Sequence, residues 1–199
     1  MPLEEAAAIP EVFFTAWDAL FVQAELRLGE TALLHAVASG VGTAAVQLCR
    51  AAGVRSLGTS RSAAKLAAVE ALGLDGAIVA GDAGFADAGA AQTTGRGVDV
   101  ILDPVGASYL GENLRALAPL GRLVLIGLMG GATGEVSLAP LLAKRLRVMG
   151  TVLRSRSLEA KATLAQRFAH EVLPLFARGA LRPVIDAVLP MTEILTVMP

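Results

Sequence analysis

Thr31-Ala32-Leu33-Leu34-His35 is followed by Ala36-Val37-Ala38-Ser39-Gly40-Val41-Gly42 and then by a run rich in alanine from Thr43 to Ala52. An apolar run, a glycine turn and a helix-forming run predict the first strand-turn-helix step of a dinucleotide-binding fold. Glycine lets backbone N–H groups approach a pyrophosphate closely, and the helix N-terminus adds a favourable dipole. We therefore predict that this turn binds phosphate through Ser39, Gly40, Val41 and Gly42, with a purely structural turn as the alternative.

Two positions of the glycine turn need separate comment, the missing first glycine and Gly42. The first glycine of the usual fingerprint is missing, because Ala36-Val37 stands in its place. A branched side chain at Gly42 is expected to occupy the space between the helix and the pyrophosphate.

The end of the second predicted strand indicates which cofactor binds. About twenty residues after the glycine turn, where an NAD-binding chain places an acidic residue, this chain has Thr59-Ser60-Arg61. Hydroxyls and a basic side chain suit a 2′-phosphate, and Lys65 lies one helical turn beyond Arg61. The pattern predicts NADPH as the cofactor. The alternative is an N-cap at Ser62 with solvated basic residues.

Two further strand ends face the same edge of the predicted sheet. Asp103 ends one strand and is either a ligand-binding residue or a turn or cap residue. The glycines of the stretch 126–131 would let the backbone pass close to a flat ligand such as a nicotinamide ring. Predicted binding residues in this stretch are Gly127, Leu128, Met129 and Gly130.

The remaining candidates are weaker. We expect His35 to be a satisfied core residue and His170 to be a surface or packing residue. Arg154 and Arg156 are either solvated edge residues or part of the ligand cleft. No cluster of His, Cys and Glu has metal-ligand spacing, so no metal site is predicted, and the sequence forces no general acid.

Strand-like and helix-like runs alternate along most of the chain, which predicts a doubly wound parallel sheet of Rossmann type with helices on both faces. The six predicted strands are 31–35, 54–59, 77–80, 98–102, 122–127 and 146–152. The predicted helices are 10–25, 41–52, 62–72, 84–93, 107–117, 137–144 and 158–178, and a late strand is predicted at 183–188.

Composition excludes several classes of protein. Of the 199 residues, 54% are hydrophobic, but no run reaches the roughly 18 apolar residues of a membrane span. The net charge of −1 gives no reason to expect nucleic acid or a membrane surface as a partner. One cysteine, Cys49, excludes an internal disulfide, and the acidic start does not resemble a secretory signal, so we expect a cytoplasmic protein.

The sixth predicted strand leaves an exposed edge. Residues 148–153 are apolar on both faces and carry no charge. Proteins cover or pair such edges. We therefore predict a homodimer in which the edge strand 146–153 pairs with its twin.

Several segments together resemble the nucleotide-binding part of zinc-free medium-chain dehydrogenases/reductases, in the quinone oxidoreductase branch. The segments that carry this resemblance are 6–11 with Thr15-Ala16, 35–36 with 39–45, 102–103, 127–131, 153–156 and 184–186. The resemblance implies an NADPH-dependent reductase of quinones or other conjugated carbonyls that works without zinc. It places cofactor contacts at Thr15, Gly40, Val41, Lys65 and the region from Gly127 to Gly131.

The chain departs from the resembled family in four places. Arg61 stands where the family has glycine, and Ala80 stands where it has a tyrosine that helps to hold the adenosine. The family's GroES-like catalytic domain and its closing helix and strand are absent, so we expect this chain alone to be weakly active or inactive. The implied division is a helical lead-in at 1–25, a Rossmann domain at 26–157 and a truncated helix and strand at 158–199.

Two other functions remain open at this point. The chain could be a non-catalytic module that binds NADPH or dimerises. It could also be an enoyl reductase domain of a larger synthase, in which this fold also occurs.

Overall fold

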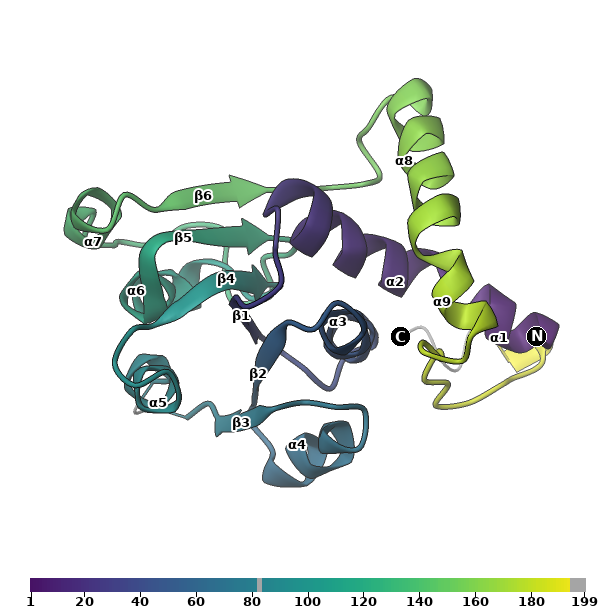
Figure 1. Cartoon of the computed structure of the whole chain (residues 1–199), viewed down its shortest axis with the longest axis horizontal. Coiled ribbons are helices and arrows are strands. Elements are labelled where there is room, and N and C mark those ends of the chain that lie inside the picture. Colours follow the sequence, from purple (N-terminus) through teal and green to yellow (C-terminus); the bar gives the residue numbers. More distant parts are fainter. Residues whose placement is uncertain (82–83, 194–199) are drawn as a thin grey trace.

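The computed structural model describes residues 1–81 and 84–193 and contains one six-stranded, fully parallel sheet (Figure 1). The strand order is β3-β2-β1-β4-β5-β6. The strands are β1 (Thr31–Leu34), β2 (Arg55–Ser60), β3 (Gly76–Val79), β4 (Val98–Asp103), β5 (Leu117–Leu125) and β6 (Arg147–Gly150). The order reverses between β1 and β4, which is the place where ligands bind in sheets of this topology. The predicted Rossmann-type sheet is confirmed.

Helices cover both faces of the sheet (Figure 1). They are α1 (Leu3–Ala7), α2 (Pro10–Trp17), the π-helix η1 (Asp18–Gln23), α3 (Gly40–Ala51), α4 (Ala63–Glu70), α5 (Ala86–Gln92), α6 (Ala107–Ala116), α7 (Ala139–Ala143), α8 (Leu158–Glu171), α9 (Leu173–Ala177) and the 3-10 turn η2 (Met191–Glu193). No helix of the described residues is long and apolar enough to span a bilayer.

Alternate residues of β1 face two separate apolar cores. Ala32 and Leu34 belong to the core that contains Val46 of α3, while Leu33 belongs to the core beneath α5 and α6 with Leu114. Because both faces of β1 are buried, its sequence is a continuous apolar run rather than an alternating one. This is why the first strand was recognisable from the sequence.

The first of these cores also holds the single cysteine of the chain. Cys49 lies on α3 and has no solvent exposure. Burial, with a smaller contribution from the charge of Asp75, raises the pKa of its thiol to about 12.

Three predicted elements differ in the structure. The late strand at 183–188 is wrong: the segment forms no strand, and the Arg182 N–H next to it donates to Oε1 of Gln47 on α3 at 2.8 Å. The predicted helix at 158–178 is divided at Val172, since Pro174 in the first turn of α9 has no N–H to continue α8. The predicted helix at 10–25 changes to the π-helix η1 at Asp18. The last six residues of segment 158–199 lie outside the described residues.

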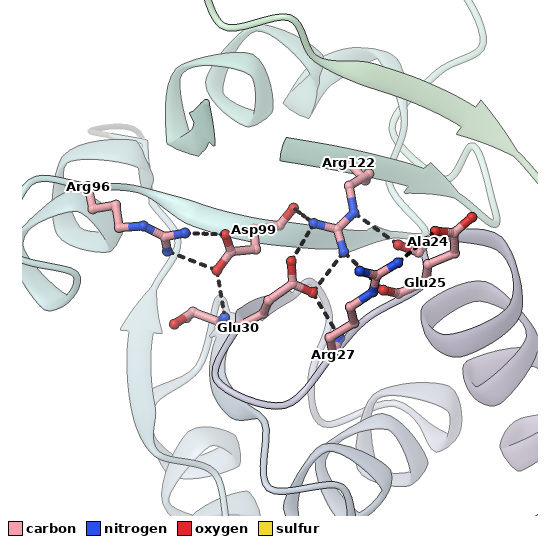
Figure 2. A network of polar contacts seen from close by, with 8 residues as sticks. Ala24, Glu25, Arg27, Glu30, Arg96, Asp99 and Arg122 are labelled. Atoms are coloured by element: carbon pink, nitrogen blue, oxygen red, sulfur yellow. Dashed lines mark hydrogen bonds and ion pairs between the residues drawn. The ribbon is translucent and has the colours of Figure 1, made fainter. Parts of the chain in front are cut away.

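A polar network around the buried Arg122 connects the segment before β1 to the sheet at the end opposite the glycine turn (Figure 2). The Arg122 guanidinium donates to both carboxylate oxygens of Glu30 at 2.8 Å and to the Ala24 carbonyl at 2.9 Å. Nearby, the Asp99 carboxylate accepts the Thr31 N–H at 2.8 Å. Burial raises the pKa of Glu30, but its hydrogen bonds with Arg122 and the Arg27 N–H outweigh burial and lower it overall.

A second ion pair, whose carboxylate is buried, connects the loop after β6 to η1. Asp18 of η1 is completely buried and accepts two hydrogen bonds from Arg156, at 2.6 and 3.1 Å. The Thr151 hydroxyl also donates to Asp18 at 2.9 Å. Arg156 is therefore a structural residue, whereas Arg154 has an exposed side chain.

Candidate cofactor site

A cleft of about 840 Å³ lies at the carboxyl ends of the strands, across the point where the strand order reverses. The end of β2, the glycine turn, and the loops after β4 and β5 form its walls. Its lining residues are Ala36, Ala38, Ser39, Thr59, Ser60, Arg61, Ser62, Lys65, Val105, Ser108, Tyr109, Met129 and Gly130.

The glycine turn leaves two backbone donors available beside the cleft. Ser39 is the N-cap of α3: its hydroxyl accepts the Gly42 N–H at 3.2 Å and its carbonyl accepts the Thr43 N–H at 2.8 Å. The first N–H groups of a helix have no intrahelical acceptor. Within the described residues, those of Gly40 and Val41 form no hydrogen bond. These two donors at a helix N-terminus fit a pyrophosphate.

Ala36, one of the two residues that stand in place of the first fingerprint glycine, has a left-handed backbone conformation. Its φ of 47° lies in the left-handed region, and its carbonyl accepts the Ser39 N–H at 2.8 Å. The chain therefore makes the tight turn without the first glycine. A non-glycine residue in this conformation costs roughly 1–2 kcal/mol.

Gly42 is needed for packing within the protein. A Cβ at this position would lie 2.6 Å from the Cα of Val37, inside the contact distance of any real side chain. The expectation that a side chain at Gly42 would fill the pyrophosphate space needs correction, because the backbone of Val37 already occupies the space beside it. Gly40 is similarly close to α2, since its Cβ would lie 2.9 Å from Cγ1 of Val12.

Polar and basic residues form the wall at the end of β2. Ser62 caps α4 by accepting the Lys65 N–H at 3.4 Å, and the Ser60 hydroxyl accepts the Ser62 N–H at 3.2 Å. The side chains of Arg61 and Lys65 are exposed and form no ion pair with any described residue. Ser62 is therefore an N-cap, and the side chains of Arg61 and Lys65 are available at the same wall of the cleft. These two cations fit a 2′-phosphate.

His35 is the buried core residue that the sequence predicted, with 1% of its surface exposed. Its Nδ1 lies 2.8 Å from the Thr59 hydroxyl, and its Nε2 lies 2.7 Å from Oδ1 of Asn113. Burial lowers the pKa of His35 to about 4, against a smaller opposing effect of Asn113. The ring is therefore neutral at pH 7.

Asp103 lies beneath the cleft and does not line it. Its carboxylate is completely buried and accepts the N–H groups of Val105 at 2.6 Å and Gly106 at 3.1 Å. It also accepts the side-chain amide of Asn113 at 2.8 Å. Burial raises the pKa of Asp103, partly opposed by these three hydrogen bonds. The geometry agrees with the turn or cap alternative for this residue.

The loops after β4 and β5 are joined to each other by backbone hydrogen bonds. The N–H groups of Met129 and Gly130 donate to the carbonyls of Pro104 at 3.2 Å and Val105 at 2.7 Å, and the Ala107 N–H donates to Gly131 at 3.0 Å. Met129 and Gly130, which were predicted to bind the cofactor, line the cleft. Predicted residues that do not line the cleft are Thr15, Gly40, Val41, Gly42, Asp103, Gly127 and Leu128.

Sequence reasoning missed two side chains of the far wall, Ser108 and Tyr109 at the start of α6. The Tyr109 ring packs edge-on against His35 at 5.0 Å and lies 5.0 Å from the Phe85 ring. The only available signal was their position directly after a strand end. Among residues 1–81 and 84–193, no group of three or more His, Cys, Asp or Glu could hold a metal ion.

The fold and the cleft together define a nucleotide-binding α/β domain of the dehydrogenase class. Residues 40–170 match the model of the zinc-binding dehydrogenase family, and the chain belongs to this family. Its structural neighbours include quinone oxidoreductases and other medium-chain dehydrogenases/reductases, which confirms the resemblance found in the sequence.

Three relatives illustrate the range of the family. The quinone oxidoreductase from Thermus thermophilus, solved also in complex with NADPH, is 36% identical with a TM-score of 0.83 over 97% of this chain and 60% of its own. The CurK enoyl reductase is 31% identical with a TM-score of 0.82 over 98% of this chain and 58% of its own. The spectinabilin polyketide synthase system protein NorB of Streptomyces orinoci is 39% identical over 189 residues, which are 90% of this chain. The chain spans little more than half of the solved relatives and 8% of the synthase.

Proposed function

We propose that this chain is the cofactor-binding domain of an NADPH-dependent oxidoreductase that reduces a quinone or another conjugated carbonyl compound. The observation that carries the proposal is the pair of exposed cations, Arg61 and Lys65, which form no ion pair within the described part of the chain and lie at one wall of a cleft beside the N-terminus of α3. An NAD-specific site would have a carboxylate at the end of β2, and no carboxylate of the described residues 1–81 and 84–193 lines this cleft.

Each wall of the cleft has a separate task in this proposal. Arg61 and Lys65 bind the 2′-phosphate, and the N–H groups of Gly40 and Val41 bind the pyrophosphate. The paired loops at Val105 and Met129 hold the nicotinamide half in place. The cofactor supplies a hydride, and the protein supplies binding, orientation and exclusion of water. No side chain is assigned as a general acid.

The substrate class is inferred from the relatives. The names of two solved relatives specify a quinone oxidoreductase and an enoyl reductase. Quinones and enoyl groups share a carbon that is made electrophilic by conjugation with a carbonyl. A conjugated carbonyl is the substrate that both kinds of relative have in common.

A second candidate is the enoyl reductase domain of a larger synthase. It is favoured by the 39% identity with a polyketide synthase protein over 90% of this chain. Faster reduction of an enoyl thioester than of a quinone by the enzyme would favour this candidate. NADPH binding without reduction of either substrate would favour the non-catalytic module instead.

The test of the cofactor site is calorimetric titration with NADPH and NADH. One charge-assisted hydrogen bond to the phosphate contributes roughly 1.5–3 kcal/mol, so NADPH should bind at least about tenfold more tightly. Arg61→Ala and Lys65→Ala should each reduce this preference while leaving NADH binding nearly unchanged. Arg178→Ala, which removes an exposed arginine after α9, is the matched control. Equal affinities for NADPH and NADH would contradict the proposal.

A further inference from the structure

A buried chain of hydrogen bonds runs beneath the cleft from Thr59 at the end of β2 to Asp103 at the end of β4. The links are Thr59 to His35 at 2.8 Å, His35 to Asn113 at 2.7 Å and Asn113 to Asp103 at 2.8 Å. All four residues are at most 1% exposed. Because no solvent reaches them, each donor must face an acceptor within the chain.

The chemistry of these groups allows one direction for the hydrogen bonds. The Asp103 carboxylate already accepts two backbone N–H groups and can only accept from Asn113, so the Asn113 amide nitrogen points toward it. The Asn113 oxygen then faces His35, and Nε2 of His35 must carry the proton. In the neutral ring Nδ1 is the acceptor, and it receives the hydrogen bond of the Thr59 hydroxyl.

Asp103 also determines the position of the far wall of the cleft. It holds the N–H groups of Val105 and Gly106, and the carbonyls of this same loop receive the N–H groups of Met129 and Gly130. Val105, Met129 and Gly130 line the cleft on the β4–β5 side, opposite Arg61 and Lys65. One carboxylate therefore supports two loops that form the nicotinamide wall.

We infer that Asp103 is a positioning residue for the nicotinamide half of the cofactor. We also infer that its charge determines which group is the donor in each hydrogen bond from Asn113 through His35 to Thr59, which we call the proton direction. The inference rests on the proposed function for the identity of the ligand. The proton direction is independent of any ligand, so the two parts are tested separately.

The first test is the tautomer of His35, measured by ¹⁵N NMR in a His170→Gln background, where His35 is the single histidine. The expected state is Nε2–H. Asp103→Asn presents an amide N–H to Asn113, so the Asn113 amide should rotate and the proton of His35 should move to Nδ1. In Thr59→Val the Nε2–H state should persist, because the direction is set from the Asp103 end. An Nδ1–H state in the unaltered chain, or reversal in Thr59→Val, would overturn the inference even if Asp103→Asn does not fold.

The second test compares two ligands. NADPH reaches both walls, whereas adenosine 2′,5′-bisphosphate carries only the adenosine half. A charge-assisted hydrogen bond is roughly twice as strong as a neutral one, so Asp103→Asn should weaken NADPH binding about fivefold through its two loop contacts. Binding of the bisphosphate should change less than twofold. Equal weakening of both ligands, or of neither, would show that Asp103 does not position the nicotinamide wall.

Asp99→Asn is the matched control, because it changes a buried carboxylate on the same strand at the opposite end of the sheet. It should lower stability without changing the ratio of the two affinities. If the unaltered chain binds neither ligand, the proposed function and the positioning role both fail, while the tautomer measurement still decides the proton direction. If both ligands bind and only the ratio stays constant, the positioning role alone fails.

Discussion

At the scale of single residues, the site combines buried polar groups beneath the cleft with exposed cations at its wall. His35 is neutral, buried and hydrogen-bonded on both ring nitrogens, and the buried Asp103 accepts three hydrogen bonds in the same network. Arg61 and Lys65 show the opposite arrangement, since they are exposed and without a charged partner among the described residues. The buried groups fix the shape of the cleft, while the exposed ones remain available to a ligand.

The pKa of His35 predicts how stability depends on pH. Unfolding restores an ordinary pKa near 6.5, whereas the folded value is about 4, so the unfolded chain binds more protons between these pH values. The contribution of His35 is therefore complete above about pH 6.5 and is lost as the pH falls toward 4. The loss should reach about 3 kcal/mol.

Urea unfolding at several pH values from 7 to 4 checks this expectation. The difference in unfolding free energy between the unaltered chain and His35→Phe should shrink as the pH falls, because phenylalanine does not titrate. The raised pKa of Asp103 acts in the opposite direction near pH 4, which is why the two chains are compared at each pH. His170→Phe, on the exposed surface of α8, is the control for loss of a histidine. Parallel pH profiles for the unaltered chain and His35→Phe would contradict the prediction.

At the scale of elements, the network around Arg122 connects β5 to the segment that leads into β1 (Figure 2). Arg122 is buried, but its partner Glu30 keeps 23% of its side chain exposed, so water would partly solvate the Glu30 carboxylate after Arg122 is removed, and losing these charged hydrogen bonds costs about 1–3 kcal/mol. Arg122→Met keeps much of the apolar stem and should lower the unfolding free energy by about this amount. Calorimetric or urea unfolding measures the change.

Arg27→Met is the comparison for the Arg122 prediction, since Arg27 is an exposed arginine whose side chain pairs, among the residues that the structure describes, with the exposed Glu25. Surface pairs of this kind contribute about 0–1 kcal/mol. A loss below about 1 kcal/mol in Arg122→Met would mean that the network does not hold the lead-in segment. The double variant of Arg122 and Glu30 to apolar residues should recover part of the loss.

The elements also show what a sequence can and cannot predict here. The six strands were predicted because each combines an apolar run with a helix-forming run after it. The segment 183–188 has the same local pattern, but it lies where Gln47 of α3 accepts the neighbouring N–H, and no strand pairs with it in the described residues. Local pattern does not specify which partner a segment meets.

The candidate site was predictable where the chain itself passes through it, as at Ser39, at 59–62 and at Met129. Tyr109 and Asn113 were missed because they lie on a helix with ordinary spacing, and only the packing of α6 brings them to His35. The roles of Gly42 and Asp103 were also misjudged or left open. Both depend on contacts with backbone atoms that the sequence does not place.

At the scale of the whole molecule, β6 is the outer strand of the sheet, and one of its edges has no neighbour in the described structure (Figure 1). Val148 is 43% exposed and Val152 is 60% exposed, and the nearby helix α7 exposes Leu142 at 78%. We predict that this edge pairs with a second copy of the chain to form a homodimer. Sedimentation at micromolar concentration should show the dimer.

Val148→Lys should convert the predicted dimer to a monomer, because a charge on an edge strand opposes pairing with its twin. Leu158→Lys, which alters an exposed leucine at the start of α8 beyond the edge strand, is the control and should leave the dimer intact. A monomeric unaltered chain at micromolar concentration would refute the prediction.

Because Cys49 is completely buried, the rate at which a thiol reagent labels it measures how often the core around α3 opens. A thiol whose pKa is about 12 holds almost no thiolate at pH 8, and only the thiolate attacks a disulfide reagent. Modification must therefore wait until α3 separates from the sheet and the thiol recovers its ordinary acidity. With excess reagent, the labelling rate of this single cysteine should report the opening of the very helix that receives the phosphates. A ligand bound at the N-terminus of α3 should slow the labelling in proportion to its saturation.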